Sequence, residues 1–536
     1  MGSFFTFLLD HIGILSFIGF TLLVGVIAYY ATRKTDENTS DGYFLGGRSL
    51  TGIVIAGSLL LTNLSTEQIV GLNGSAFSEG ILVMAWETLA AIAMVVTAIF
   101  LLPRYLKGGI TTVPQFLERR YDTTTKAIAS GLFLTGYAIV LLPIVLYTGS
   151  LALSTMFDIP ELLGVSKNVS IWLCVFGIGI VGSIYAIFGG LKAVAVSDTI
   201  NAIGLLIGGI LIPIFGLLEI GDGSIAQGLS TVFKENPEKF DATGDSNASV
   251  PFATIFTGMM LVQLFYWGTN QAIIQRALGA KNLKEGQKGL LLASFIKILG
   301  PLIVVLPGII AFHMFGDTLD KADEAYPMLV SKVLPLSLVG FFAAVLFGAI
   351  LSSFNSALNS SVTLFGVDIY KEYINKEASE RQTVKAGKLF GTGLALFAMI
   401  IAPFLQSAES IFSYLQQVNG CYSIPILTII VVGYLTKNVP AVAAKIAILC
   451  GAVLYLLYVI LDATVLDGLF PHFLHVMAIL FVLNVAIMLI IGKIQPRAHP
   501  YIQKYTQEVE IAPWKGVKIT GALICMVVIG IYIYFS

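Results

Sequence analysis

Two charged side chains lie in stretches of sequence that are otherwise apolar. Glu87 lies in VMAWETLAAIAMVV and Lys297 lies in LLLASFIKILGPLIVVLPGII, while Glu67 and Asp198 lie close to other apolar runs. A charge in the middle of a bilayer costs about 2.5 to 3.5 kcal/mol on insertion scales, so each one needs a partner, a wet cavity or a function. Glu87 and Lys297 form either a structural ion pair or a ligand site, in which they and nearby amides meet the hydroxyls of a neutral polyol.

The polar stretch TNLSTEQ, residues 62–68, interrupts an apolar run and predicts a broken helix. Irregular backbone at membrane depth is tolerated only where it lines a cavity, and its freed carbonyl groups can bind a cation. A second apolar run with a polar centre, containing Gln263, Tyr266 and Asn270, follows five runs later. Discontinuous helices at matching places in two halves of a chain are typical of an inverted repeat, so the spacing favours a five-plus-five arrangement.

A polar stripe follows one face of a later apolar run. Ser352, Ser356, Asn359, Ser360 and Thr363 recur at helical spacing. Such residues often join helices by hydrogen bonds within a membrane, which is one interpretation. The other is that Ser352 and its neighbour, Ser353, supply hydroxyl ligands to a hard cation such as sodium, which prefers oxygen.

These residues must be positioned by membrane helices, because the composition is that of a membrane protein. Of the 536 residues 56% are hydrophobic and 12% are charged, and the mean hydropathy is +0.87. A hydrocarbon core of about 30 Å needs roughly 20 apolar residues per helix. We therefore predict an all-α membrane protein with about fourteen transmembrane helices, near residues 13–30, 52–72, 81–102, 128–156, 169–188, 196–218, 252–278, 290–315, 336–365, 384–405, 411–435, 441–461, 473–491 and 517–535.

Lysine and arginine predict the orientation of these helices. Of the 31 basic residues, 25 fall in loops on the side that follows the first span, five fall in loops on the other side, and Lys297 lies within a span. Because short cytoplasmic loops carry the positive excess, both termini are expected outside the cell membrane, in a bacterium on the periplasmic side of the inner membrane. The longest outer segment, residues 219–250, is rich in Gly, Ser, Asp and Asn, and we expect it to be a solvated excursion rather than a folded domain.

Several classes of protein are disfavoured. The formal net charge is -1, which gives no reason to expect nucleic acid as a partner, and no motif indicates an obligate protein partner. No catalytic triad, phosphate loop or metal-ligand spacing occurs, so we do not expect an enzyme. The expected span interiors contain no arginine, which favours a neutral solute over a carboxylate.

Longer motifs carry a resemblance to a known family. They are GYFLGGRSL at 42–50, SLLLTNLSTEQIVGL at 58–72, YAIFGGLKAV at 185–194 and FYWGTNQAIIQR at 265–276, together with KILGPLIVVLPG and ILSSFNSALNS. The chain resembles the solute:sodium symporter family over essentially its whole length, and within it the sodium/glucose and sodium/galactose branch. The resemblance implies one membrane domain, 1–536, with a LeuT-like core of two inverted repeats, 50–218 and 252–435. One extra helix, 13–30, precedes the core and three, within 441–535, follow it.

The resemblance also implies roles for individual residues. The substrate would contact Asn63, Gln68, Glu87, Gln263, Tyr266, Lys297 and Gln416. Tyr266 would also form an inner gate, and Leu72, Trp86 and Phe412 would form further gate positions. Sodium would bind the backbone carbonyls of Leu61, Leu64 and Ala349 and the hydroxyls of Ser352 and Ser353, with Asp198 nearby on the inner side.

The function expected from the resemblance is sodium-coupled symport of a neutral hexose by alternating access. The partners would be the sugar, sodium and the lipid bilayer. Gln263 stands where the galactose symporter has Asn, and Ala90 stands where it has Ser, so the identity of the sugar stays open. Alternatives are a polyol, sialic acid or amino acid as cargo, a proton in place of sodium, and a sugar sensor or sodium-leak channel that does not concentrate its solute.

Overall fold

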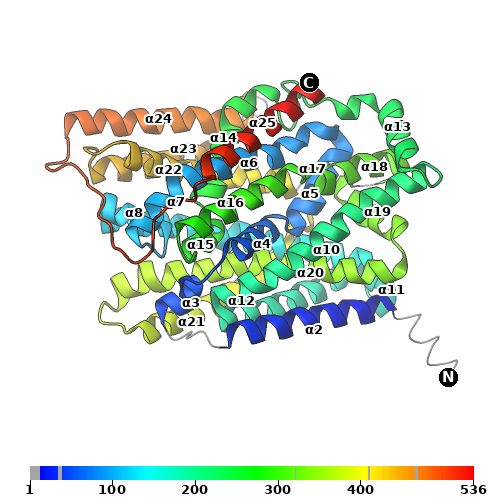
Figure 1. The fold of residues 1–536 in the computed structure, drawn as a ribbon, viewed down its shortest axis with the longest axis horizontal. Helices are drawn as coiled ribbons and strands as arrows, with labels where there is room; N and C mark the ends of the chain where they lie inside the picture. The colour runs from blue at the N-terminus through cyan, green and yellow to red at the C-terminus, as the bar shows by residue number, and fades with distance from the viewer. Residues whose placement is uncertain (1–11, 34–38, 320, 408–410, 465–468) are drawn as a thin grey trace.

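The computed structural model describes residues 12–33, 39–319, 321–407, 411–464 and 469–536, and these residues form an all-helical molecule (Figure 1). The elements of the first half are α2 (Ile12–Thr32), α3 (Ser40–Leu45), η1 (Gly46–Arg48), α4 (Gly52–Asn63), α5 (Thr66–Glu79), η2 (Gly80–Met84), α6 (Ala85–Val96), η3 (Thr97–Leu101), α7 (Leu102–Gly108), α8 (Val113–Arg120), α9 (Thr123–Gly136), η4 (Tyr137–Leu141), α10 (Leu142–Met156), α11 (Ile159–Leu163), α12 (Lys167–Ile220), α13 (Ile225–Glu235) and η5 (Pro237–Phe240).

The second half continues with further helices of the same kinds. They are η6 (Phe252–Phe256), α14 (Gly258–Gly268), α15 (Gln271–Leu278), α16 (Leu283–Ile298), α17 (Pro301–Val304), α18 (Leu306–Phe315), η7 (Gly316–Thr318), η8 (Ala322–Glu324), α19 (Ala325–Val333), α20 (Leu336–Thr363), η9 (Leu364–Ile374), α21 (Glu380–Ile401), η10 (Ala402–Ser407), α22 (Ile411–Leu435), α23 (Ala441–Thr464), α24 (Phe473–Ile494) and α25 (Val517–Phe535).

The number of spans is less clear than the sequence suggested. Among the described residues, ten helices are long and apolar enough to cross a membrane, and α16 with α17 and α18 adds one more span bent by 48°. The expected count of fourteen is therefore not confirmed. The first expected span corresponds to α2, Ile12–Thr32, and the second is broken after the short helix α4, Gly52–Asn63.

α12 contains two spans joined without a loop. Within its 54 residues only Gly190 has non-helical angles, with φ of 57° and ψ of -174°. Positive φ strains any residue with a Cβ, so glycine is suited to this turn. The kink divides α12 into Lys167–Ile187 and Gly190–Ile220, close to the two spans expected from the sequence.

α20 lies at the centre of the molecule, where it packs against α12 and α2, while α4 packs against α12 and α16. Small residues bring these helices together, as is usual where lipid removes the hydrophobic drive between helices. A Cβ on Gly57 of α4 would lie 2.8 Å from Cα of Thr199 in α12. This close approach holds the broken helix against α12.

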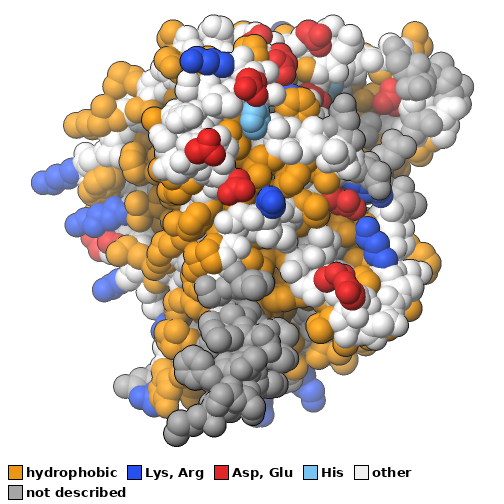
Figure 2. All heavy atoms as spheres, turned by 90° about the vertical axis from the view of Figure 1, so that its right-hand side faces the viewer, with side chains coloured by type: hydrophobic (Ala, Val, Ile, Leu, Met, Phe, Trp, Pro, Cys, Tyr) orange, Lys and Arg blue, Asp and Glu red, His pale blue; other side chains and the backbone are white. Residues whose placement is uncertain are grey.

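Loops and short helices gather at two ends of the bundle (Figure 1). α8, α3 and the segment between α24 and α25 lie at one end, and α13, α19 and α11 lie at the other, together with the last residue of the chain. Figure 2 looks onto this second end, where Asp and Glu side chains are scattered among hydrophobic and polar ones.

Residues 219–250 are only partly a solvated excursion. The segment contains α13 and η5, and Lys239 of η5 is buried. The ammonium of Lys239 donates to the carbonyls of Phe77 (3.0 Å) and Ser78 (2.6 Å) near the end of α5. Glu79 accepts bonds from the amide and hydroxyl of Ser249, both at 2.8 Å. The segment is therefore fastened to α5.

Candidate functional site

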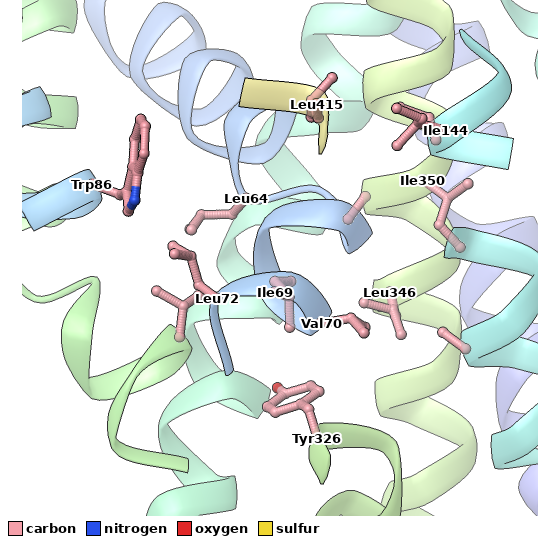
Figure 3. Close-up of a cluster of buried hydrophobic side chains, with 14 of the residues drawn as sticks. Leu64, Ile69, Val70, Leu72, Trp86, Ile144, Tyr326, Leu346, Ile350 and Leu415 are labelled. Atoms are coloured by element: carbon pink, nitrogen blue, oxygen red, sulfur yellow. The ribbon is translucent and has the colours of Figure 1, made fainter. Parts of the chain in front are cut away.

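The predicted break in the second span is present between α4 and α5. α4 ends at Asn63, Leu64 has a non-helical ψ of 52°, and Ser65 is extended with ψ of 175°. Carbonyls in the last turn of a helix lack amide partners within that helix, so the end of α4 presents acceptors at this depth. In Figure 3, Leu64 and Leu72 lie on the side of the break toward Trp86, while Ile69 and Val70 lie toward α20.

Glu87 and Lys297 are in contact at this break. The Lys297 ammonium donates to a carboxylate oxygen of Glu87 and to the amide oxygen of Asn63. The Gln68 amide donates to the other Glu87 oxygen at 2.8 Å. All four side chains are buried, and they come from α4, α5, α6 and α16. The contact makes a neutral cluster in which each charge has an opposite partner.

The structure describes the surroundings of most of the other residues that the resemblance assigns to the substrate or to the gates. Gln263 of α14 donates to the carbonyl of Trp86 at 2.9 Å, and so holds the backbone of α6 beside Glu87. Tyr266 is half-buried and its ring contacts Trp267, which itself lies 5.7 Å from the Lys297 ammonium. Gln416 is half-buried on α22. The side chain of Phe412 lies outside the described residues, so its gate role stays a prediction.

The hydroxyls expected to bind sodium lie where α20 crosses the end of α4. Ser353 donates to the carbonyl of Thr62 at 2.9 Å, and the hydroxyls of Thr62 and Ser352 lie 3.2 Å apart. The carbonyls of Leu61 and Leu64 belong to the same helix end, and Ala349 precedes Ser353 by one turn of α20. Uncharged oxygens on two crossing elements are a suitable donor set for a hard monovalent cation, and the residues present fit sodium.

Asp198 belongs to a second polar cluster next to these hydroxyls. It accepts a hydrogen bond from Ser58 at 2.6 Å, and Ser58 also contacts the guanidinium of Arg276 at 3.2 Å. Arg276 further donates to Ser356 and to the carbonyl of Ala272. A cavity of about 20 Å³ touches both Asp198 and Ser352, so the two clusters adjoin.

Arg276 is the residue that sequence reasoning missed. We counted it among the loop charges because it lies two residues before the end of an expected span. The structure instead buries it completely on α15, so the expectation of an arginine-free interior is wrong. The sequence signal for its burial was the amphipathic character of the segment QAIIQRAL. In the structure the side chains of Gln271, Gln275 and Arg276 are all buried and form hydrogen bonds.

Helices interrupted beside a buried polar site, in an all-helical membrane bundle, define the architecture of a secondary transporter. A family model described as the sodium:solute symporter family matches residues 43–451. The chain belongs to the sodium:solute symporter family. It is thus a sodium-coupled solute symporter with sodium as its coupling ion.

Relatives in sequence cover nearly the whole chain. The uncharacterized symporter YidK of Escherichia coli (strain K12) is 48% identical over 98% of this chain and 91% of its own length. The sodium/glucose cotransporter of Vibrio parahaemolyticus is 32% identical, with 88% and 90% covered. The sodium/myo-inositol cotransporter 2 of Rattus norvegicus is 28% identical, with 84% and 70% covered.

Solved structures share the fold. A substrate-bound, outward-open structure of a sodium-coupled sialic acid symporter superposes with a TM-score of 0.77, at 21% identity, over 92% of this chain and 99% of the other. A closed structure of Mhp1, a nucleobase-cation-symport-1 family transporter, gives a TM-score of 0.55 at 14% identity, over 84% and 95%. The fold expected from the sequence, an all-helical LeuT-like transporter, is confirmed.

Proposed function

We propose that this symporter imports a neutral, polyhydroxylated solute, a hexose such as glucose or galactose, through the inner membrane of a bacterium. The observation that carries the proposal is the cluster of Glu87, Lys297, Gln68 and Asn63, which holds one positive and one negative charge and two amides. The hydroxyls of a sugar both donate and accept hydrogen bonds, so they can replace each contact without adding net charge. A carboxylate solute would leave Glu87 facing a like charge.

Transport follows by alternating access around the broken helix. Sodium binds the carbonyls of Leu61, Leu64 and Ala349 with Ser352 and Ser353, and joins α4 to α20. The sugar meets the cluster from the other side of the break, with Gln263, Tyr266 and Gln416 completing its contacts and Leu72, Trp86 and Phe412 closing the path. The transport of sodium and the transport of the sugar are coupled because binding of each one favours the same closed state. Asp198 lies on the route of sodium release, and the repeats 50–218 and 252–435 supply the two halves of the motion.

A second candidate cargo is a cyclic polyol, since the chain is similar to sodium/myo-inositol cotransporter 2 of several mammals. An inositol, like a hexopyranose, carries hydroxyls around a six-membered ring and would use the same cluster. Sialic acid and amino acids carry a carboxylate, and they are less suited to a site with a paired ammonium.

The test is uptake of radiolabelled glucose, galactose and myo-inositol into proteoliposomes, under a sodium, potassium or proton gradient. We expect accumulation only with sodium. Lys297→Ala should weaken sugar affinity at least about tenfold, as expected for loss of one charged hydrogen bond, and should leave sodium affinity unchanged. Ser353→Ala should weaken sodium affinity, whereas Ser361→Ala, which removes a hydroxyl bonded only to Ala357 of its own helix, should not.

Each result has a defined meaning. Unchanged sugar kinetics in Lys297→Ala would remove this lysine from the substrate site. Downhill sodium flux without accumulation of any solute would identify a leak channel or sensor. Accumulation of sialic acid or an amino acid in place of the sugars would contradict the neutral cargo.

A further inference from the structure

A pocket of about 590 Å³ lies beside the start of α16, away from the transport site. It is formed by the first turns of α16 and by the segment that leads into α25. Its polar and aromatic lining consists of Asn282, Lys284, Lys288, Glu510, Trp514 and Lys515. Three lysines against one glutamate leave the pocket positive, although Lys288 also lies 3.5 Å from Glu285.

The walls of this pocket are held by hydrogen bonds that backbone amides donate. The amide of Leu283 donates to the carbonyl of Glu510 at 2.9 Å. The amide of Trp514 donates to the side chain of Gln287 at 2.8 Å, and the amide of Val517 donates to the Trp514 carbonyl at 3.2 Å. The segment is therefore attached to α16 on both sides of the opening, so the pocket exists before any ligand arrives.

On α16, the two lysines of the pocket are followed by a row of exposed apolar residues. Lys284 and Lys288 are followed at helical spacing by Leu292, Phe295 and Leu299, which are 40%, 55% and 40% exposed. Residues at this spacing share one face of a helix. The face that carries the positive charge in the pocket thus continues as an apolar surface toward the middle of the membrane.

α25 repeats this arrangement beside α16, against which it packs (Figure 1). Lys515, two residues before the start of α25, is followed on that helix by Ile519, Leu523 and Met526, which are 70%, 53% and 58% exposed. Both helices run in the same direction away from the pocket. The basic ends of α16 and α25 therefore both lie at the pocket, and an exposed apolar face extends along each helix from there.

We propose that this pocket binds an anionic phospholipid. The phosphodiester group lies between Lys284, Lys288 and Lys515, and Trp514 sits at the level of the headgroup, where tryptophan is favoured. The acyl chains follow the exposed faces of α16 and α25. Basic pockets between membrane helices bind anionic headgroups, and each lysine near the surface contributes to the attraction. The proposal does not depend on the identity of the transported solute.

The test measures lipid binding to the full-length purified protein without any transport assay. Native mass spectrometry compares retention of phosphatidylglycerol with that of phosphatidylcholine, and added inorganic phosphate serves as a competitor. The variant carries Lys284→Gln, Lys288→Gln and Lys515→Gln. The matched control carries Lys371→Gln, Lys376→Gln and Lys385→Gln, which removes the same charge at the same end of the bundle, from η9, α21 and the loop between them.

We expect the wild type and the control to retain phosphatidylglycerol over phosphatidylcholine, and the pocket variant to lose this preference by roughly ten- to hundredfold. The single variant Lys515→Gln should lose part of it, and it covers the case in which the triple variant does not fold. Equal retention in all proteins, equal loss in pocket variant and control, or displacement of the lipid by millimolar phosphate would each overturn the assignment.

Discussion

The contact between Glu87 and Lys297 explains how two charged side chains can both be buried away from solvent. Burial of either group alone would cost several kcal/mol, and removal of one partner would leave the other uncompensated. Asn63 and Gln68 complete the hydrogen bonding of the pair. The same groups are those that the proposed sugar would need, so the structural and the ligand-binding interpretations are compatible with each other.

Gly300 offers a test of this cluster that leaves its four side chains in place. An added Cβ at Gly300 would collide with a carboxylate oxygen of Glu87, while the backbone angles of Gly300 are helical and suit alanine. We expect Gly300→Ala to displace the carboxylate from Lys297 and to weaken sugar affinity by roughly 5- to 150-fold, since overpacking costs about 1 to 3 kcal/mol. Uptake as a function of sugar concentration measures the effect.

Gly393→Ala on α21 is the control for this substitution, because no atom lies within 4 Å of the added carbon. It should leave sugar affinity unchanged. If Gly300→Ala also leaves it unchanged, the position of the Glu87 carboxylate does not matter for sugar binding.

At the scale of elements, α5 is the second half of the broken helix and is fastened at its far end. Lys239 donates to two carbonyls in the last turn of α5, where a cation also meets the negative end of the helix dipole. The ring of Phe312 lies 3.8 Å from the same ammonium. Burial lowers the pKa of Lys239, although Glu238 and Glu79 partly oppose the shift.

Replacing Lys239 by methionine should loosen this end of α5. The apolar stem is kept, but the carbonyls of Phe77 and Ser78 lose their donor, at a cost of about 1 to 3 kcal/mol. We expect faster hydrogen exchange in residues 74–80 and a lower melting temperature. Lys234→Met, at an exposed position on α13, should change neither quantity. Equal exchange rates in the two variants would show that Lys239 does not hold α5.

η8 covers another part of α5 and supplies a pH dependence. Asp323 lies against Gly74, and burial raises its pKa from 3.8 to about 6, with Lys321 opposing the shift and Glu324 adding to it. A carboxyl whose pKa is raised on folding stabilises the fold while it is protonated. This contribution is lost as the pH rises from about 4 through about 6.

Asp323→Asn should therefore remove a destabilising charge at neutral pH. We expect the melting temperature of the variant to exceed that of the wild type by roughly 1 to 3 °C at about pH 8, and the difference to vanish at about pH 4. Thermal unfolding in a series of buffers measures it. A constant difference across this range would assign the effect to packing instead of charge.

At the scale of the whole molecule, the two interrupted helices meet at one end of the bundle. Leu50, just before α4, pairs with the chain just after α15: its amide donates to Gly279 at 3.1 Å and its carbonyl accepts from Lys281 at 3.0 Å. This joins the first half of one interrupted helix, α4, to the second half of the other, α15, across the two proposed repeats. Movement of one half must therefore carry the other or break these bonds.

The orientation of the bundle is a prediction for the whole chain. Loops rich in lysine and arginine should face the cytoplasm, so a single cysteine in place of the exposed Ser246 should react with a membrane-impermeant maleimide in intact cells. A single cysteine at Gln507, between α24 and α25, should react only after the cells are opened. The four native cysteines must first be replaced. The reverse labelling pattern would invert the proposed direction of transport.

The sequence alone was enough to predict the membrane class, the helical fold, the break after Asn63 and the polar face of α20. Hydropathy, helical periodicity and polar interruptions are local properties, and they can be read from neighbouring residues. The Glu87 and Lys297 pair was also foreseen as a pair, because lone charges in apolar runs require partners. The expected count of fourteen spans is not confirmed, because the separate pieces of a broken or bent helix are each shorter than the length that identifies a span.

Local sequence patterns do not show how distant groups are brought together, and the tertiary structure decides this. Lys297 lies 210 residues from Glu87 and 234 from Asn63, and no local pattern shows that α4, α6 and α16 converge. The burial of Arg276 and the attachment of Lys239 to α5 depend on the same packing, since each charge finds its partners on helices far away in sequence. Local physics determines which segments enter the membrane, whereas the close approach of helices through small residues determines which of their polar groups share a site.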